Sequence, residues 1–171
     1  MDIQIFCQVI YKEIEFYFQE EVYNPTIYII TVFLIVNLFI CLKSYQESRY
    51  RKNVYGTTPF LYLLGIFVWG DGIIIGLFWC LASLVVFFAN DLYLYAVFVS
   101  YFWVVRSFGE IIYWLNQQFS SKDRNPAKKT LIHTIFPYDS YLFAYQVFWQ
   151  CVLVLALIAS VYITIYWVQK L

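Results

Sequence analysis

The sequence predicts an all-α integral membrane protein, with four transmembrane helices preceded by an amphipathic helix. Of its 171 residues, 63% are hydrophobic and only 13% are charged. A single soluble core of this size could not hide so much apolar surface. The apolar residues also gather in four runs long enough to cross a bilayer core of about 30 Å. We therefore expect one membrane domain over residues 1–171, arranged as a four-helix bundle that contains an intramembrane ion pair.

The chain begins with a predicted amphipathic helix over residues 2–21, whose apolar side chains follow the i, i+3, i+4 spacing of one helical face. Its polar face is acidic, which disfavours anionic lipid, so we expect it to dock against the bundle. The first span follows at about 26–42, with Pro25 suited to a helix start. Asn37 is strongly polar, and we expect it to hydrogen bond to another helix, with a ligand role as the weaker alternative.

The second predicted span, about 60–88, is too long for the bilayer. As one helix it would measure about 43 Å, so it must tilt, protrude or break. Asp71 between Gly70 and Gly72 is the candidate break. Gly72 and Gly76 form a GxxxG pattern that favours close helix packing, and functional unwinding at Gly70–Gly72 is the alternative.

The third and fourth spans, about 92–118 and 141–168, both carry polar side chains. In the third span these residues fall on one helical stripe, which should face protein or water. The stripe consists of Ser100, Trp103, Arg106, Ser107, Glu110, Trp114 and Gln117. In the fourth span, Gln146 and Gln150 share a face.

The charges in the loops predict an orientation. Residues 43–58 and 119–140 hold four Lys or Arg each and flank the spans alternately. The positive-inside rule places both basic loops in the cytoplasm and both termini outside the cell membrane.

Three charged residues inside the spans form the best candidate for a site. The short turn at residues 90–91 puts Asp71 level with Arg106 and Glu110, near mid-depth, and Gln150 reaches a similar depth. Because an isolated charge in the bilayer is costly, we expect Arg106 to lie between the two carboxylates. Their formal sum of −1 allows one carboxylate to hold a proton, and the sequence does not say which.

These features favour a non-enzymatic membrane subunit or assembly partner, in which the charge network fixes helix packing. The partner would be another membrane protein or a second copy of the chain. The alternative is a small oligomeric transporter or channel whose carboxylates bind a proton or cation. An enzyme is less favoured, because no Ser/His/Asp spacing, HExxH motif, metal-ligand cluster or cofactor motif occurs. The near-zero net charge argues against nucleic acid as a partner.

Overall fold

A computed structural model describes residues 25–120, 135–136 and 140–170. Its order of elements is α2 (Pro25–Arg49), the short 3₁₀ helix η1 (Pro59–Leu64), α3 (Trp69–Ala89), α4 (Leu92–Gln118) and α6 (Ser140–Val168). All four long helices are apolar and long enough to cross a membrane. The predicted all-helical, four-span architecture is confirmed. The amphipathic helix predicted for residues 2–21 lies outside the described residues.

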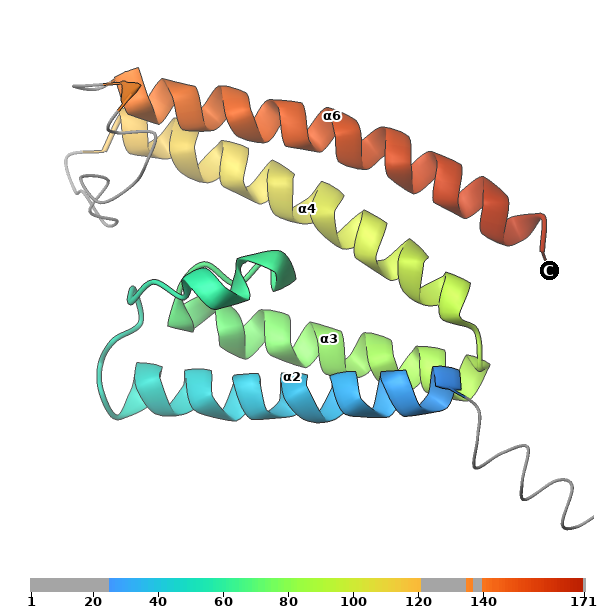
Figure 1. The fold of residues 1–171 in the computed structure, drawn as a ribbon. Helices are drawn as coiled ribbons and strands as arrows, with labels where there is room; N and C mark the ends of the chain where they lie inside the picture. Colours follow the sequence, from blue (N-terminus) through green and yellow to red (C-terminus); the bar gives the residue numbers. More distant parts are fainter. Residues whose placement is uncertain (1–24, 121–134, 137–139, 171) are drawn as a thin grey trace, which may run out of the picture.

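The four helices pack as two pairs, not as one evenly packed bundle. Helix α2 lies along α3, α4 lies along α6, and α3 and α4 make few direct contacts (Figure 1). The 3₁₀ helix η1 lies between the pairs. Asp91 caps α4 by accepting the backbone N–H of Tyr93 at 2.8 Å. The short turn at residues 90–91 was expected to hold α3 and α4 side by side. Instead, the two helices diverge from this turn and each packs on another partner.

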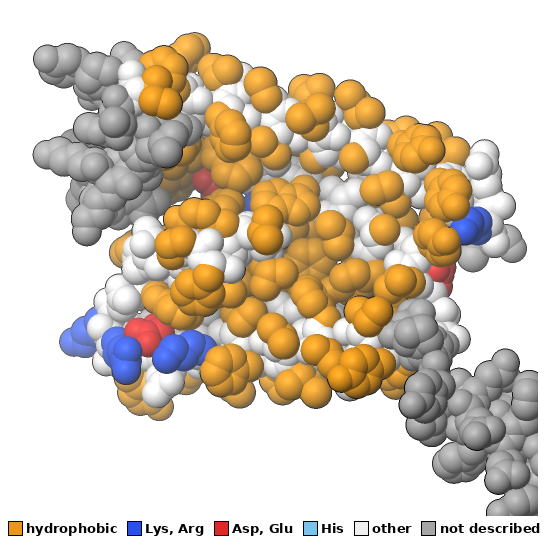
Figure 2. All heavy atoms as spheres, in the orientation of Figure 1, with side chains coloured by type: hydrophobic (Ala, Val, Ile, Leu, Met, Phe, Trp, Pro, Cys, Tyr) orange, Lys and Arg blue, Asp and Glu red, His pale blue; other side chains and the backbone are white. Residues whose placement is uncertain are grey.

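The outer surface is apolar over much of its area, as a lipid-facing protein requires. Figure 2 shows hydrophobic side chains along all four long helices, and large apolar residues such as Phe88 are almost fully exposed. An apolar surface of this extent is rare on soluble monomers. Together with the four spans, it indicates a multi-pass protein in a lipid bilayer.

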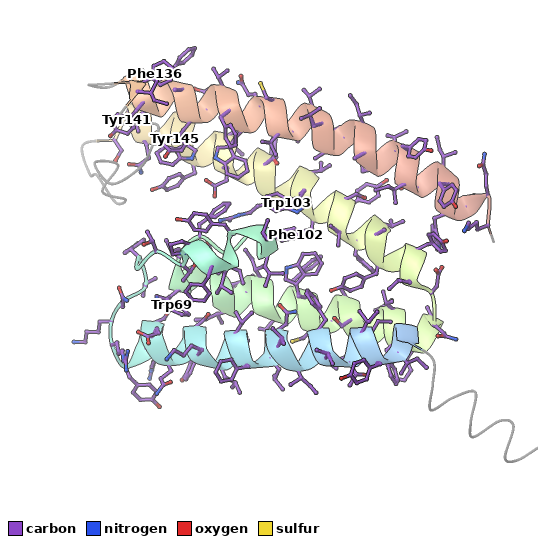
Figure 3. The ribbon with its side chains drawn as sticks, viewed as in Figure 1. Trp69, Phe102, Trp103, Phe136, Tyr141 and Tyr145 are labelled. Carbon is purple, nitrogen blue, oxygen red and sulfur yellow. The ribbon has the colours of Figure 1, made fainter. Side chains whose placement is uncertain are left out.

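The main core lies where α2, α3, α4 and η1 meet. Phe102 points from α4 toward α3 (Figure 3) and contacts the Trp79 ring at a centroid distance of 4.8 Å. Within the α4–α6 pair, the Trp114 ring of α4 stacks parallel to the Tyr145 ring of α6, at a centroid distance of 4.3 Å. The buried core residues are Ile40, Leu61, Ile66, Ile75, Trp79, Ala82 and Phe102.

Two helix boundaries differ from the prediction. Helix α2 continues through Arg49, beyond the expected end near residue 42. Glu47 supports this last part of the helix by an ion pair with Lys43 one turn earlier, and it also pairs with Arg51 just after the helix. Helix α3 begins at Trp69, not near residue 60. Its 21 residues measure about 31 Å, which matches the bilayer core without excess length.

Candidate functional site

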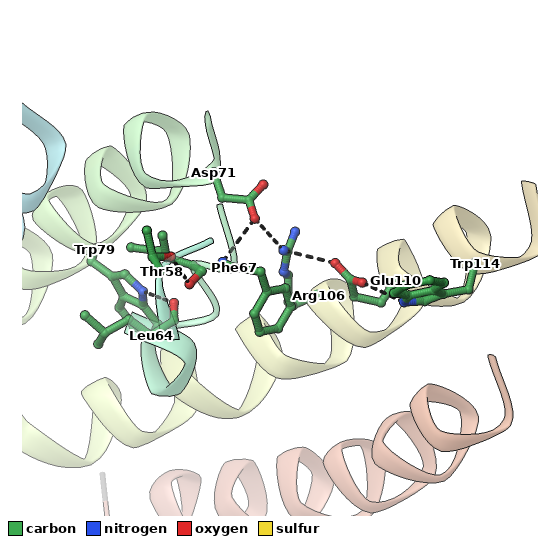
Figure 4. A network of polar contacts seen from close by, with 9 residues as sticks. Thr58, Leu64, Phe67, Asp71, Trp79, Arg106, Glu110 and Trp114 are labelled. Carbon is green, nitrogen blue, oxygen red and sulfur yellow. Dashed lines mark hydrogen bonds and ion pairs between the residues drawn. The ribbon is translucent and has the colours of Figure 1, made fainter. Parts of the chain in front are cut away.

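An ion network connects the two helix pairs. The Arg106 Nη2 atom lies 2.7 Å from Asp71 Oδ2 on α3 and 3.0 Å from Glu110 Oε1 on α4 (Figure 4). Arg106 and Glu110 are one helical turn apart, so α4 presents both groups to the same point. The structure thus brings together three of the four residues of the predicted cluster.

Further contacts hold each charged group in place. Asp71 Oδ2 accepts the backbone N–H of Phe67 at 3.2 Å, and Glu110 Oε2 accepts Trp114 Nε1–H at 3.1 Å. The Arg106 guanidinium lies over the Phe67 ring, 4.5 Å from its centroid. Charge-assisted hydrogen bonds of this kind are stronger than neutral ones and fix geometry.

The network is largely, but not fully, enclosed. The Arg106, Asp71 and Glu110 side chains are 18%, 24% and 12% exposed. The formal charge is −1, as expected from the sequence. Asp71 lies in the first turn of α3, so it sits closer to the helix end than the predicted mid-depth position.

Residues 59–68 form a re-entrant segment that the sequence prediction missed. The predicted span over 60–88 is wrong in this part, because residues 60–68 do not belong to the spanning helix: η1 ends at Leu64, and the chain reverses at Gly65, whose φ is +73°. After this reversal, residues 66–68 run antiparallel to the residues before η1, and Thr57 and Val68 form a β-bridge. The candidate break at Gly70–Gly72, given as the alternative to close packing, does not occur, since these residues belong to the first turn of α3.

Side chains satisfy the backbone of this segment. Thr58 Oγ1–H donates to the Ile66 carbonyl at 2.9 Å, and Trp79 Nε1–H donates to the Leu64 carbonyl at 3.1 Å. Trp79 lies ten residues after the start of α3, so the tip of the segment reaches about 15 Å along that helix. Non-helical backbone at such a depth is tolerated where protein surrounds it or water reaches it.

The re-entrant segment contacts both helix pairs. A Cβ atom added at Gly65 would overlap the Phe102 ring and lie 3.6 Å from Arg106 Cγ on α4. The Phe67 ring is 5.5 Å from the Trp149 ring of α6. The segment therefore fills the space between the pairs next to the ion network.

The α2–α3 pair approaches most closely at the predicted glycines. A Cβ atom at Gly76 would lie 3.0 Å from Cys41 Cβ, and one at Gly72 would collide with Ser44 Oγ. Asn37 is fully buried in this pair and donates its Nδ2–H to the Phe33 carbonyl of its own helix, 2.8 Å away. The expected bond from Asn37 to another helix is not the one observed.

The remaining polar candidates lie on or beside the α4–α6 pair. Gln146 accepts Gln118 Nε2–H at 2.7 Å and so joins α6 to α4. Gln117 is half-buried, whereas Gln150 is exposed on α6 and is not among the residues that contact Arg106. The fourth predicted member is thus separate from the network.

A second group of polar contacts joins α4 and α6 at the end of the pair opposite to the Gln118–Gln146 bond. Trp167 Nε1–H donates to Asp91 Oδ2. The Lys170 amine lies over the rings of Tyr93 and Tyr166, at 3.8 Å and 4.8 Å. Hydrogen bonding to Tyr93 raises the pKa of the Lys170 amine above its usual value.

Sequence analysis missed Thr58, Phe67, Trp79 and Gln118 as polar or aromatic partners. The one available signal was the excess length of the second apolar run together with Pro59, which is typical of a helix start. Within the described part of the chain, no three His, Cys, Asp or Glu side chains group as a metal site would require. Comparisons with protein-family models, curated proteins and solved structures give no match for this chain.

Proposed function

We propose that this protein is a non-enzymatic subunit or assembly partner of the membrane, in which the Asp71–Arg106–Glu110 network holds two helix pairs in a fixed arrangement. The observation that carries the proposal is the single Arg106 nitrogen shared by carboxylates from α3 and α4. The backbones of these two helices approach each other at few points, and aromatic contacts such as that between Trp79 and Phe102 are another link between them. A paired charge adds modest net stability but strongly disfavours arrangements that separate the pair.

The exposed faces of α4 and α6 support a role in assembly. In the most apolar stretch of each of these helices, only 11% is buried against the rest of the chain. In α3 the corresponding share is 39%. Gln150 is an exposed polar side chain within this apolar surface. In lipid, an amide is favoured where it can hydrogen bond to a neighbouring helix. A second copy of the chain or another membrane protein would supply that helix.

The test is to measure thermal unfolding in detergent for Arg106→Gln, Asp71→Asn and the double variant. Arg106→Gln leaves the Asp71 and Glu110 carboxylates without their shared cation, and we expect the free energy of unfolding to fall by about 3 kcal/mol. Asp71→Asn keeps the Arg106–Glu110 pair and should cost less, and adding it to Arg106→Gln should recover part of the loss. Arg49→Gln, an exposed position on α2, is the matched control.

Two results would reject the proposal. One is an Arg106→Gln variant as stable as Arg49→Gln. The other is a pair of single variants that fold and assemble normally yet abolish a cellular phenotype, because fixing the helices would then not be the function of the charges.

We also propose that both basic segments, 43–58 and 119–140, lie in the cytoplasm and that both termini lie outside. The support is the number of Lys and Arg in these segments. A membrane-impermeant thiol reagent applied to intact cells should label Gln169→Cys and spare Lys52→Cys, with the unmodified protein as background. The reverse labelling pattern would overturn this orientation.

A small transporter or channel is the second candidate, and the re-entrant segment is the observation that favours it. Broken backbone beside intramembrane carboxylates is typical of ion and proton sites in transporters. In proteoliposomes, such a protein would move protons or cations down an imposed gradient, and Asp71→Asn would stop this movement without unfolding the protein. No flux in the wild-type protein would exclude this candidate.

A further inference from the structure

The end of α2 carries a group of basic side chains that the ion network does not use. We define the basic collar as Lys43, Arg49, Arg51 and Lys52. Figure 2 shows several Lys or Arg side chains around one acidic side chain at this end of the molecule. The four cations fall within ten residues, with Glu47 as the one acid among them, so the collar is strongly positive.

Glu47 organises the collar without neutralising it. Its side chain is 7% exposed, and Oε1 lies 2.8 Å from Arg51 Nη1 and 3.5 Å from Lys43 Nζ. The Arg51 and Lys43 side chains nevertheless remain 65% and 40% exposed. One buried carboxylate therefore positions two cations whose other donors face outward, while Arg49 and Lys52 are exposed as well.

Exposed tyrosines surround the same helix end. Tyr45, Tyr50 and Tyr55 are all exposed, and the Tyr45 and Tyr50 rings meet edge to face at 6.3 Å. Tyrosine is enriched at the membrane–water interface, where the ring contacts acyl chains and the hydroxyl contacts water and head groups. Exposed tyrosines at this helix end therefore favour a position of the collar near the lipid phosphates.

We propose that the basic collar binds the phosphate groups of anionic phospholipids in the leaflet that it faces. Arginine and lysine at this depth are complementary to that charge. Stabilisation of the helix C-terminus is a simpler role for basic residues. It accounts for Arg49 in the last turn but not for Lys52, which follows the helix. The proposal goes beyond the ion network and does not depend on it.

The experiment uses the full-length protein purified in a neutral detergent and mixed with equal amounts of phosphatidylglycerol and phosphatidylcholine. Native mass spectrometry counts the lipids that remain bound. The test variant is Arg49→Gln/Lys52→Gln, which spares the Glu47 ion pairs. The control is Lys170→Gln, which removes a positive charge at the opposite end.

We expect the wild-type protein to retain phosphatidylglycerol in preference to phosphatidylcholine, and higher ionic strength to weaken this preference. Each removed cation should lower phosphatidylglycerol binding about fivefold, or about 25-fold for the double variant. Lys170→Gln should bind like the wild type. Equal retention of the two lipids by the wild type, or an unchanged preference in the double variant, would overturn the proposal. If the double variant keeps its lipid preference but loses a co-purifying acidic protein, the collar binds a protein and not lipid, and the proposal is overturned.

Discussion

Replacing Gly76 with alanine tests how closely α2 and α3 approach each other. The added methyl group would lie 3.0 Å from Cys41 Cβ and 3.3 Å from Cys41 Cα. These atoms belong to or adjoin the backbone, so a rotamer change cannot make room for it. Relief requires the two helices to separate, and forcing extra volume into a packed interface costs about 1–3 kcal/mol.

Gly109 of α4 supplies a matched control, because a Cβ atom there meets nothing within 4 Å. In a helix interior, alanine is favoured over glycine by about 1 kcal/mol. Gly109→Ala should therefore be at least as stable as the wild type. In Gly76→Ala the same gain is offset by overpacking, so the two variants should differ by about 1–3 kcal/mol.

The assay is unfolding in mixed micelles of neutral detergent and dodecyl sulfate, followed by tryptophan fluorescence. Both variants carry the same substitution in a helix, so intrinsic helix propensity cancels in the comparison. Equal stability of Gly76→Ala and Gly109→Ala would refute close packing between α2 and α3.

Two further substitutions probe the other polar contacts in the same assay. Trp79→Phe removes the donor to the partly buried Leu64 carbonyl and should lower the free energy of unfolding by about 1 kcal/mol. Wild-type stability of this variant would mean that the bond contributes nothing to holding the re-entrant segment. Gln146→Ala removes the bond to Gln118 and should cost about 1 kcal/mol. The exposed Gln150→Ala is its control, and an equal effect of the two would contradict the inter-helix role of Gln146.

The four membrane-spanning helices could be predicted because the length and composition of apolar runs determine them. The charge cluster could be predicted in part, since the i, i+4 spacing of Arg106 and Glu110 follows from helix geometry alone. The position of Asp71 beside Arg106 followed from counting residues on either side of the short turn. That count does not depend on how closely the two helices pack along the rest of their length.

The pairing of helices could not be predicted in the same way. A short turn indicates that two helix ends are adjacent, but it does not determine whether the helices stay together. Helix α3 packs on α2, where Gly72 and Gly76 allow close approach. Helix α4 packs on α6 through rings such as Trp114 and Tyr145. Side-chain shape decides these partners, and hydropathy carries little of that information.

The re-entrant segment was the largest omission, and its cause is specific. Residues 60–68 are as apolar as the helix that follows, so hydropathy does not separate them. Asp71 between two glycines resembled a break, yet an acidic residue in a first helical turn is also a helix-start signal. Gly65, with its positive φ, is the residue at which the chain reverses.

The bonding of the re-entrant segment also bears on how the chain matures as it is synthesised. The bonds to the Leu64 and Ile66 carbonyls come from Trp79 and Thr58, and Asp71 accepts the Phe67 N–H. All of these donors and acceptors leave the ribosome before α4. The backbone bonds of the re-entrant segment therefore need only residues from the first half of the chain, whereas the ion pair of Asp71 needs Arg106 from the second half. The two halves thus differ in what each must wait for: the segment closes on its own neighbours, and the Asp71 carboxylate gains its counter-charge only from α4.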